Sequence, residues 1–254
     1  MRLPPSVMGA GRQVAWEQMG DATIPVSELF GPTLQGEGPH AGRTVQFLRT
    51  GGCNLSCSWC DTPYTWDGSR FDLRSEITPT PARDIVAKLI PDVPLVLSGG
   101  EPLLHQDNLG LRYVLESANR RGCTVHVETN GTLKPSVAFR ALAIVYGVSP
   151  KLDHAGPHRG SQDSQMHEFW PRFAGRNPNV FLKVVVRNAE DVDRVAHLAW
   201  ETNWPLRQVW VMPLGTSTEA LMENWTEIAG AAARHHINAT QRLHVLAWGD
   251  TKGT

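Results

Sequence analysis

Short apolar runs alternate along this chain with segments whose apolar residues recur every three or four positions. The runs that predict strands lie at 44–49, 94–97, 124–128, 141–148, 180–186 and 209–212. The segments that predict helices lie at 82–90, 111–118, 192–199 and 221–232. Such alternation favours a parallel sheet with helical crossovers. We therefore expect an α/β fold, a partial (β/α) barrel of about six parallel strands, with its chemistry at the C-terminal strand ends. The run 243–248 is predicted as a last strand.

Length and charge narrow the class of protein. The 254 residues suit one α/β barrel, and a chain of this size buries a core without disulfides. Lys plus Arg (24) nearly equals Asp plus Glu (25), so no direct nucleic-acid partner is expected. The longest apolar runs, such as 141–148, fall far short of the roughly 18 residues of a membrane span.

The N-terminal segment 1–22 is rich in Gly, Pro and Gln and shows no clear period. It has no apolar stretch of the secretory type, so we expect a cytoplasmic protein in a reducing compartment. We predict a loose N-terminal extension over 1–22, in which Trp16 is the residue most suited to dock on the body of the protein. The domain proper is predicted over 23–254.

Three of the four cysteines lie within the stretch GGCNLSCSWCDT, at Cys53, Cys57 and Cys60. A structural zinc site usually takes four ligands in two separated pairs, and an ordinary iron–sulfur cluster takes four cysteines. Cys123 stands alone and is interpreted as a small core residue. Three close thiols therefore favour a four-iron cluster with one iron open to a small molecule. Zinc or coincidental thiols remain as less favoured interpretations, and a disulfide less favoured still.

Polar and glycine-rich motifs follow the other predicted strands. They are Ser98–Pro102 (SGGEP), Glu128–Gly131 (ETNG), Ser149–Lys151 (SPK) and Met212–Gly215 (MPLG). Each motif alone is compatible with a simple turn, because Gly, Pro and Asn-Gly are common turn residues. Glycines also allow a close backbone approach to a ligand. The repetition of these motifs at successive strand ends favours a single pocket there that binds one ligand.

The spacing C-x3-C-x2-C with Trp59 directly before the last cysteine resembles the radical S-adenosylmethionine (SAM) superfamily. That resemblance implies a radical SAM barrel with its cluster loop at 53–60. It also implies that the open iron binds the amino and carboxylate groups of SAM. An electron from the cluster would then split the sulfonium and free a 5′-deoxyadenosyl radical, which takes a hydrogen atom from the substrate. The SGGEP stretch is similar to the superfamily motif whose backbone holds the methionine end of SAM.

Three features near the cysteines bear on the substrate. TLQGEG at 33–38 places Gln35 and Glu37 beside glycines, where they can read the donor and acceptor edge of a flat heterocycle. A plain polar loop explains this stretch equally well. Arg49 can clamp a carboxylate bidentately or form a surface salt bridge. Thr62 follows the last cysteine by two positions, and threonine hydroxyls can bind Mg²⁺.

Together with CDTPYTW and RLHVLAWG, these features resemble the 7-carboxy-7-deazaguanine synthase family, from about Ser27 to the C-terminus. The resemblance implies a carbon–nitrogen lyase that contracts the ring of 6-carboxy-5,6,7,8-tetrahydropterin to 7-carboxy-7-deazaguanine and releases ammonia. This reaction is a step toward queuosine and other 7-deazapurines. The implied cofactors are a [4Fe-4S] cluster, SAM and Mg²⁺. The implied partners are the pterin, an external one-electron reductant and a second copy of the chain in a homodimer.

The resemblance also implies residue roles, with no catalytic residue beyond the cofactor-derived radical. Cys53, Cys57 and Cys60 would hold the cluster, and Thr62 would bind Mg²⁺. The residues that would contact SAM are Trp59, Cys60, Asp61, Gly100, Glu101, Glu128, Ser149, Pro150, Lys151, Met212, Pro213, Leu214 and Gly215. The residues that would contact the substrate are Leu34, Gln35, Gly36, Glu37, Arg49, Ser98 and His244.

Some features depart from the family pattern. Met212 stands where family members often have Gln, so a SAM contact there rests on the backbone. Residues 1–22 have no counterpart. Two other functions remain open: another radical SAM enzyme of the activating type, which must dock a large protein, and a non-enzymatic iron–sulfur electron carrier or zinc module. The sequence does not decide whether the product feeds tRNA modification or a secreted small molecule.

Overall fold

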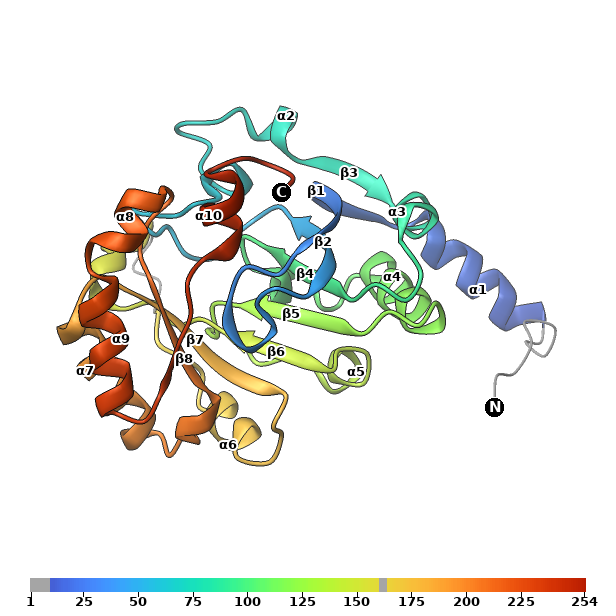
Figure 1. The fold of residues 1–254 in the computed structure, drawn as a ribbon. Helices are drawn as coiled ribbons and strands as arrows, with labels where there is room; N and C mark the ends of the chain where they lie inside the picture. The colour runs from blue at the N-terminus through green and yellow to red at the C-terminus, as the bar shows by residue number, and fades with distance from the viewer. Residues whose placement is uncertain (1–9, 160–163) are drawn as a thin grey trace.

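The computed structural model describes residues 10–159 and 164–254. They form a single nine-stranded sheet with helices packed around it (Figure 1). The strand order is β3-β1-β2-β4-β5-β6-β7-β8-β9. All neighbours from β2 to β9 run parallel, and β1 runs antiparallel to both β2 and β3. Six longer parallel strands, β2 and β4 to β8, thus form the predicted partial barrel.

The strands of the sheet have the following bounds: β1 Thr23–Leu34, β2 Thr44–Thr50, β3 Thr78–Pro81, β4 Leu95–Gly99, β5 Val125–Thr129, β6 Val145–Val148, β7 Val180–Val186, β8 Val209–Pro213 and β9 Asn238–Ala239. The central strands are apolar and buried along their length because helices cover the barrel, and β7 is buried at every position. Strand ends are aligned, with Thr50 beside Gly99 and Thr129 beside Val148. The loops that follow them therefore share one edge.

The helices have the following bounds: α1 Ala10–Asp21, α2 Leu73–Glu76, α3 Ala82–Lys88, α4 Leu109–Arg120, α5 Val137–Arg140, α6 Phe169–Ala174, α7 Ala189–Glu201, α8 Thr218–Glu223, α9 Trp225–Arg234 and α10 Leu243–Trp248. The long crossover helices are amphipathic. In α4, Leu111, Val114 and Leu115 are fully buried, and Asn108 caps the helix by accepting a hydrogen bond from the Leu111 amide.

One large apolar core joins these helices to the sheet. It runs from Ile24 through the strands to Ile237 and includes Cys123, which confirms the interpretation of this cysteine as a core residue. Truncation of a fully buried Leu or Ile in such a core costs about 2–5 kcal/mol.

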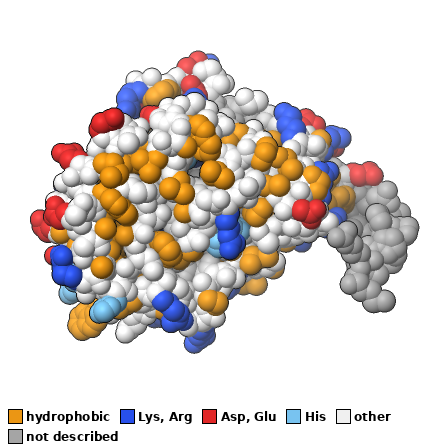
Figure 2. Space-filling view, viewed as in Figure 1, with side chains coloured by type: hydrophobic (Ala, Val, Ile, Leu, Met, Phe, Trp, Pro, Cys, Tyr) orange, Lys and Arg blue, Asp and Glu red, His pale blue; other side chains and the backbone are white. Residues whose placement is uncertain are grey.

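Among the described residues, no helix is both long and apolar enough to cross a membrane. Figure 2 shows acidic and basic side chains interspersed at the edges of one face, as the balanced charge leads one to expect.

The structure corrects three sequence expectations. Residues 243–248 form helix α10 and not a last strand, because a short apolar run cannot distinguish the two and the sheet already ends at β9. The predicted helix 221–232 is two helices that meet at Asn224. The predicted strand 141–148 is a strand only over β6.

Strand β1 was not predicted, because Pro25, Gly31 and Pro32 argue against a regular strand. The structure accommodates Pro32 in an irregularity of the pairing between Phe30 and Thr33. Edge strand β3 reads TPTP and was missed for the same reason.

The predicted N-terminal extension falls partly on residues 1–9, which lie outside the described residues. From Ala10 it continues as helix α1, which lies beside α3 and α4 (Figure 1). Trp16 packs on Tyr113 of α4, with ring centroids 4.4 Å apart, and Arg120 lies 4.0 Å over its ring. These contacts tie the helix to the core domain.

Candidate active site

A cavity of about 650 Å³ opens where the parallel strands end. Its lining comes from the segment after β1, the cysteine loop after β2, the ends of β4 to β8, and the C-terminal segment from α10 to Thr254. Segments far apart in the sequence thus meet at one mouth, as the aligned strand ends lead one to expect. Figure 1 shows α10 and the C-terminus close together, and residues of both line the cavity together with the three cysteines.

The cavity brings together most of the predicted site residues. Besides the three close cysteines, they are Leu34, Gln35, Gly36, Glu37, Arg49, Trp59, Asp61, Thr62, Ser98, Gly100, Glu128, Ser149, Lys151, Met212, Leu214, Gly215 and His244. Three predicted residues, Glu101, Pro150 and Pro213, are not part of this lining. Glu101 is completely buried beneath it. Its carboxylate accepts hydrogen bonds from the Leu103 amide and the Asn130 amide at 3.0 and 2.7 Å, so its side chain fastens two strand ends together.

The cysteine loop is anchored from both sides. The Gly52 amide donates to the Thr65 carbonyl at 2.7 Å, and the Ser58 amide donates to the Ala155 carbonyl at 2.9 Å. Burial raises the pKa of the Cys53 thiol to about 12 and also raises the pKa of Cys57. These two thiols are therefore protonated near neutral pH, and positive charge from bound metal would favour their thiolate form.

The glycines after β4 allow the neighbouring loops to approach closely. Gly99 has a φ of +149°, and a Cβ at Gly100 would overlap the Gly52 carbonyl and approach Cys53. The Glu101 amide donates to the Gly52 carbonyl at 2.8 Å. The SGGEP stretch is thus fitted directly against the cysteine loop, and side chains at these glycines would separate the two.

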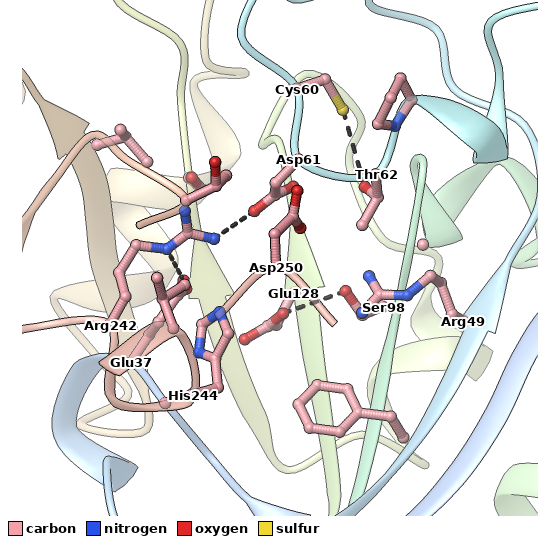
Figure 3. Close-up of a pocket in the computed structure, with 18 of the residues that line it drawn as sticks. Glu37, Arg49, Cys60, Asp61, Thr62, Ser98, Glu128, Arg242, His244 and Asp250 are labelled. Atoms are coloured by element: carbon pink, nitrogen blue, oxygen red, sulfur yellow. Dashed lines mark hydrogen bonds and ion pairs between the residues drawn. The ribbon is translucent and has the colours of Figure 1, made fainter. Parts of the chain in front are cut away.

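A network of charges, largely buried except at Asp61, forms one wall of the cavity (Figure 3). Lys183, which lies on β7, is 2.6 Å from Glu37 Oε2 and 2.8 Å from Glu128 Oε1. Arg242, which immediately precedes α10, binds Glu37 Oε1 through its Nε at 2.8 Å and also pairs with Asp61 of the cysteine loop. Two cations thus hold three carboxylates around the cavity.

The charges of this network keep Glu37 and Asp61 ionised. Burial alone would raise the pKa of Glu37, but Lys183 and Arg242 more than offset it, and the pKa lies well below its usual value. The pKa of Asp61 is also lowered, because Arg242 and Arg49 outweigh the effect of burial. Glu37 is therefore a fixed hydrogen-bond acceptor at the cavity wall.

Three neutral polar groups complete this wall. Ser98 Oγ donates to Glu128 Oε2 at 3.1 Å, and Gln35 Nε2 donates to Glu128 Oε1 at 3.3 Å. His244 lies directly against Gly36, where an added Cβ would overlap the imidazole ring. Burial lowers the pKa of His244, so the ring is uncharged near neutral pH and presents one donor and one acceptor.

Arg49 and Thr62 lie at the other side of the cavity (Figure 3). Arg49 Nε is bound to Glu28 Oε2 at 2.6 Å, and the Tyr64 hydroxyl donates to the same carboxylate at 2.7 Å. Thr62 Oγ1 lies 3.7 Å from Cys60 Sγ, next to the cluster loop. Asp250 from the C-terminal segment also lines the cavity here.

Sequence analysis assigned no role to Lys183, to Arg242 at the start of the RLHVLAWG stretch, or to the C-terminal residues 249–254. For Lys183 a signal existed, because it is the single charge in the otherwise apolar run VFLKVVV and is 4% exposed. A charge inside a buried strand needs partners, so it marks a polar site. Arg242 carried no comparable signal, since its role depends on the helix that the sequence did not predict.

Comparison with known proteins decides the family. The model of the radical SAM superfamily matches residues 47–143. A 7-carboxy-7-deazaguanine synthase of Pyrobaculum aerophilum is 35% identical over 233 residues, which cover 91% of this chain and 97% of that protein. The chain belongs to the 7-carboxy-7-deazaguanine synthase family. A second family member, from Bacillus cereus, is 38% identical over 91% of this chain and 98% of its own length.

The fold of a solved structure agrees with this family. The crystal structure of QueE from Escherichia coli matches with a TM-score of 0.64, over 93% of this chain and 100% of that chain, at 21% identity. At this identity the match concerns the fold, a radical SAM partial barrel with a mostly parallel sheet.

The donor set of the cysteine loop fits the four-iron cluster of the superfamily. Within the described residues, no three Cys, His, Asp or Glu side chains converge on a single ion position. In a cluster each thiolate binds a different iron, so the sulfurs need not converge. Cys53, Cys57 and Cys60 all line one end of the cavity, beside the apolar side chains of Leu55 and Ala155. A radical SAM enzyme requires this cluster and SAM, and the loop can hold them.

Proposed function

We propose that this protein converts 6-carboxy-5,6,7,8-tetrahydropterin to 7-carboxy-7-deazaguanine with loss of ammonia. The observation that carries the proposal is one cavity that joins three cysteines at one end to a wall of ionised and hydrogen-bonding groups at the other. A volume of about 650 Å³ is in the range of pockets for small molecules. A large protein substrate, as in activating enzymes, has no need of such a wall.

The cysteine end holds the cofactors in this proposal. Cys53, Cys57 and Cys60 bind the [4Fe-4S] cluster, whose open iron binds SAM. When bound, these groups supply the one-electron chemistry that starts hydrogen abstraction. Gly100 gives SAM close backbone access, and Lys151, which donates to Ser149 Oγ at 2.9 Å, faces the same space from the end of β6. Trp59 and Asp61 lie on the cysteine loop. Met212, Leu214 and Gly215 line the cavity at the end of β8 and just after it.

The charged wall binds the heterocycle. Glu37 accepts hydrogen bonds from the N–H groups of the heterocycle, because Lys183 and Arg242 keep this carboxylate ionised. Leu34, Gln35 and Gly36 border the ring on the segment after β1. Ser98 and His244 supply further polar contacts, and His244 can donate and accept because it is uncharged near neutral pH. Arg49 faces the substrate carboxylate from the end of β2.

Thr62 would hold Mg²⁺ through its hydroxyl in this proposal, and the ion would supply positive charge for the substrate carboxylate. A hard cation that retains several waters suits a site with few protein ligands. Such an ion would fix the substrate near the cysteine loop and so favour hydrogen abstraction. We also propose that the protein works in the cytoplasm as a homodimer and receives electrons from an external one-electron donor.

The test is formation of 5′-deoxyadenosine by the protein reconstituted with iron and sulfide under anaerobic conditions. We expect rapid formation when reductant, SAM, Mg²⁺ and the carboxytetrahydropterin are all present. Omission of the pterin should reduce the rate strongly, and Cys57→Ala should abolish it. SAM cleavage at a rate that does not depend on the pterin would agree with a radical SAM enzyme but would contradict the pterin as its substrate. No SAM cleavage from protein with a verified cluster would reject the enzymatic function.

A further inference from the structure

The side chain of Trp66 contacts a predicted cluster ligand. Trp66 follows the short helical turn Pro63–Thr65, and its backbone amide donates to the Pro63 carbonyl at 3.1 Å. Its indole Nε1 lies 3.4 Å from Cys60 Sγ. Because the indole nitrogen is a donor only, the direction of this hydrogen bond is fixed: Trp66 donates and the sulfur accepts.

A second loop holds the indole ring in place. The guanidinium of Arg159 lies 4.8 Å from the centroid of the Trp66 ring. Arg159 is itself fixed by an ion pair with Asp67 at 2.7 Å and by its backbone amide, which donates to Ser56 Oγ at 2.9 Å. A cation over the face of the ring draws electron density from it and so strengthens the indole N–H as a donor.

The other donors near the cysteine sulfurs differ in kind or distance. The Leu55 amide donates to Cys53 Sγ at 3.4 Å, but it belongs to the backbone. At Cys60, Thr62 Oγ1 is more distant than Trp66, at 3.7 Å. The indole nitrogen of Trp59 is buried and has no hydrogen-bond partner. Trp66 is therefore the nearer of the two side chains that the described part of the chain brings to Cys60 Sγ.

We propose that Trp66 raises the reduction potential of the cluster by donating its indole N–H to the Cys60 thiolate. A hydrogen bond to a ligand sulfur stabilises negative charge there, and the reduced cluster carries one more negative charge than the oxidised cluster. The bond therefore favours the reduced state. This inference rests on the four-iron cluster of the proposed function and assigns Trp66 a tuning role at it.

The direct test is a redox titration of the reconstituted protein without SAM, followed by electron paramagnetic resonance. Trp66→Phe keeps an aromatic ring for Arg159 but removes the N–H. At a fixed potential we expect the ratio of reduced to oxidised cluster to be about tenfold lower in Trp66→Phe than in the wild type. This corresponds to a midpoint potential that is lower by about 59 mV for one electron. Trp204→Phe is the matched control, because it removes a buried indole N–H that has no partner and does not line the cavity, and its potential should equal that of the wild type.

Two results would overturn the proposal. One is a wild-type potential in Trp66→Phe protein that carries four irons per chain. The other is an equal shift in Trp204→Phe, which would reveal a general effect of altered packing.

A measurement on the wild-type sequence covers the case in which Trp66→Phe does not assemble a cluster. Protein labelled with indole-¹⁵N-tryptophan should show a ¹⁵N coupling in the electron–nuclear double resonance spectrum of the reduced cluster. Absence of that coupling would contradict the hydrogen bond. Iron analysis of the wild-type protein distinguishes failure of this inference from failure of the proposed function. A wild-type protein without a four-iron cluster would contradict both.

Discussion

Lys183 is the residue on which the charged wall of the cavity depends most. It is buried in strand β7 and bridges Glu37 from the segment after β1 to Glu128 at the end of β5. Burial would lower the pKa of Lys183, but the two carboxylates raise it above its usual value. The ammonium is therefore charged near neutral pH, and it holds both carboxylates at the cavity wall.

We predict that Lys183→Met destabilises the protein and weakens substrate binding. Loss of one partner from a buried ion pair typically costs about 3–5 kcal/mol, because the remaining charge is uncompensated. Urea unfolding measures the stability, and the pterin dependence of turnover gives the KM, which we expect to rise about tenfold or more. Lys88→Met is the matched control at an exposed lysine of α3 and should change stability by less than about 0.5 kcal/mol. Equal effects of the two substitutions would contradict this assignment.

The pH dependence of the same variant follows from Glu37. Its pKa in the folded protein lies well below its ordinary value of 4.5, so its stabilising contribution is complete above that value and is lost as the pH falls below it. Removal of Lys183 raises this pKa. The stability difference between wild type and Lys183→Met should therefore be largest near pH 7 and shrink toward pH 4. A stability difference between the two proteins that grows as the pH falls would contradict the role of Lys183 in lowering the pKa of Glu37.

Two elements from opposite ends of the chain meet at the pterin side of the cavity. Gly36 follows strand β1, and its carbonyl accepts a hydrogen bond from the Leu243 amide at the start of α10 at 2.9 Å. His244 on α10 then lies against Gly36 with no room for a Cβ between them. The glycine is thus needed for the approach of the helix, and the helix places the histidine.

We predict that Gly36→Ala impairs turnover by displacing His244 and α10 from the wall. The double variant Gly36→Ala/His244→Ala removes the overlap, so it should be less impaired than the sum of the two single changes predicts. Steady-state kinetics of the four proteins measures this coupling. Strict additivity of the two effects would show that the contact between Gly36 and His244 does not matter for turnover.

At the level of elements, the sequence predicted what periodicity can reveal. The run VFLKVVV became β7, and the apolar spacing of 111–118 became the buried face of α4. Helix α10 was missed because its pattern fits a strand as well, and only the available space at the edge of the sheet decides. Strand β1 was missed because its prolines and glycine are tolerated only through an irregular pairing that depends on β2.

At the scale of the whole molecule, the fold class followed from the alternation of strands and helices, and the motifs placed the site at the strand ends. Arg242 could not be predicted, because its partners Glu37 and Asp61 are distant in the sequence and meet only in the folded barrel. The motif that contains Glu101 likewise gave no indication that this side chain is completely buried and joins two strand ends, because its partners Leu103 and Asn130 meet it only in the folded protein.

The central claim is that one cavity joins a cluster loop to a pterin-binding wall, and the mass of the product tests it most directly. Reconstituted, reduced protein would be incubated anaerobically with SAM, Mg²⁺ and 6-carboxytetrahydropterin, and the pterin followed by mass spectrometry. We predict a product lighter than the pterin by one ammonia, formed by the wild type and absent with Cys57→Ala. An unchanged pterin in the presence of an intact cluster and cleaved SAM would contradict the claim.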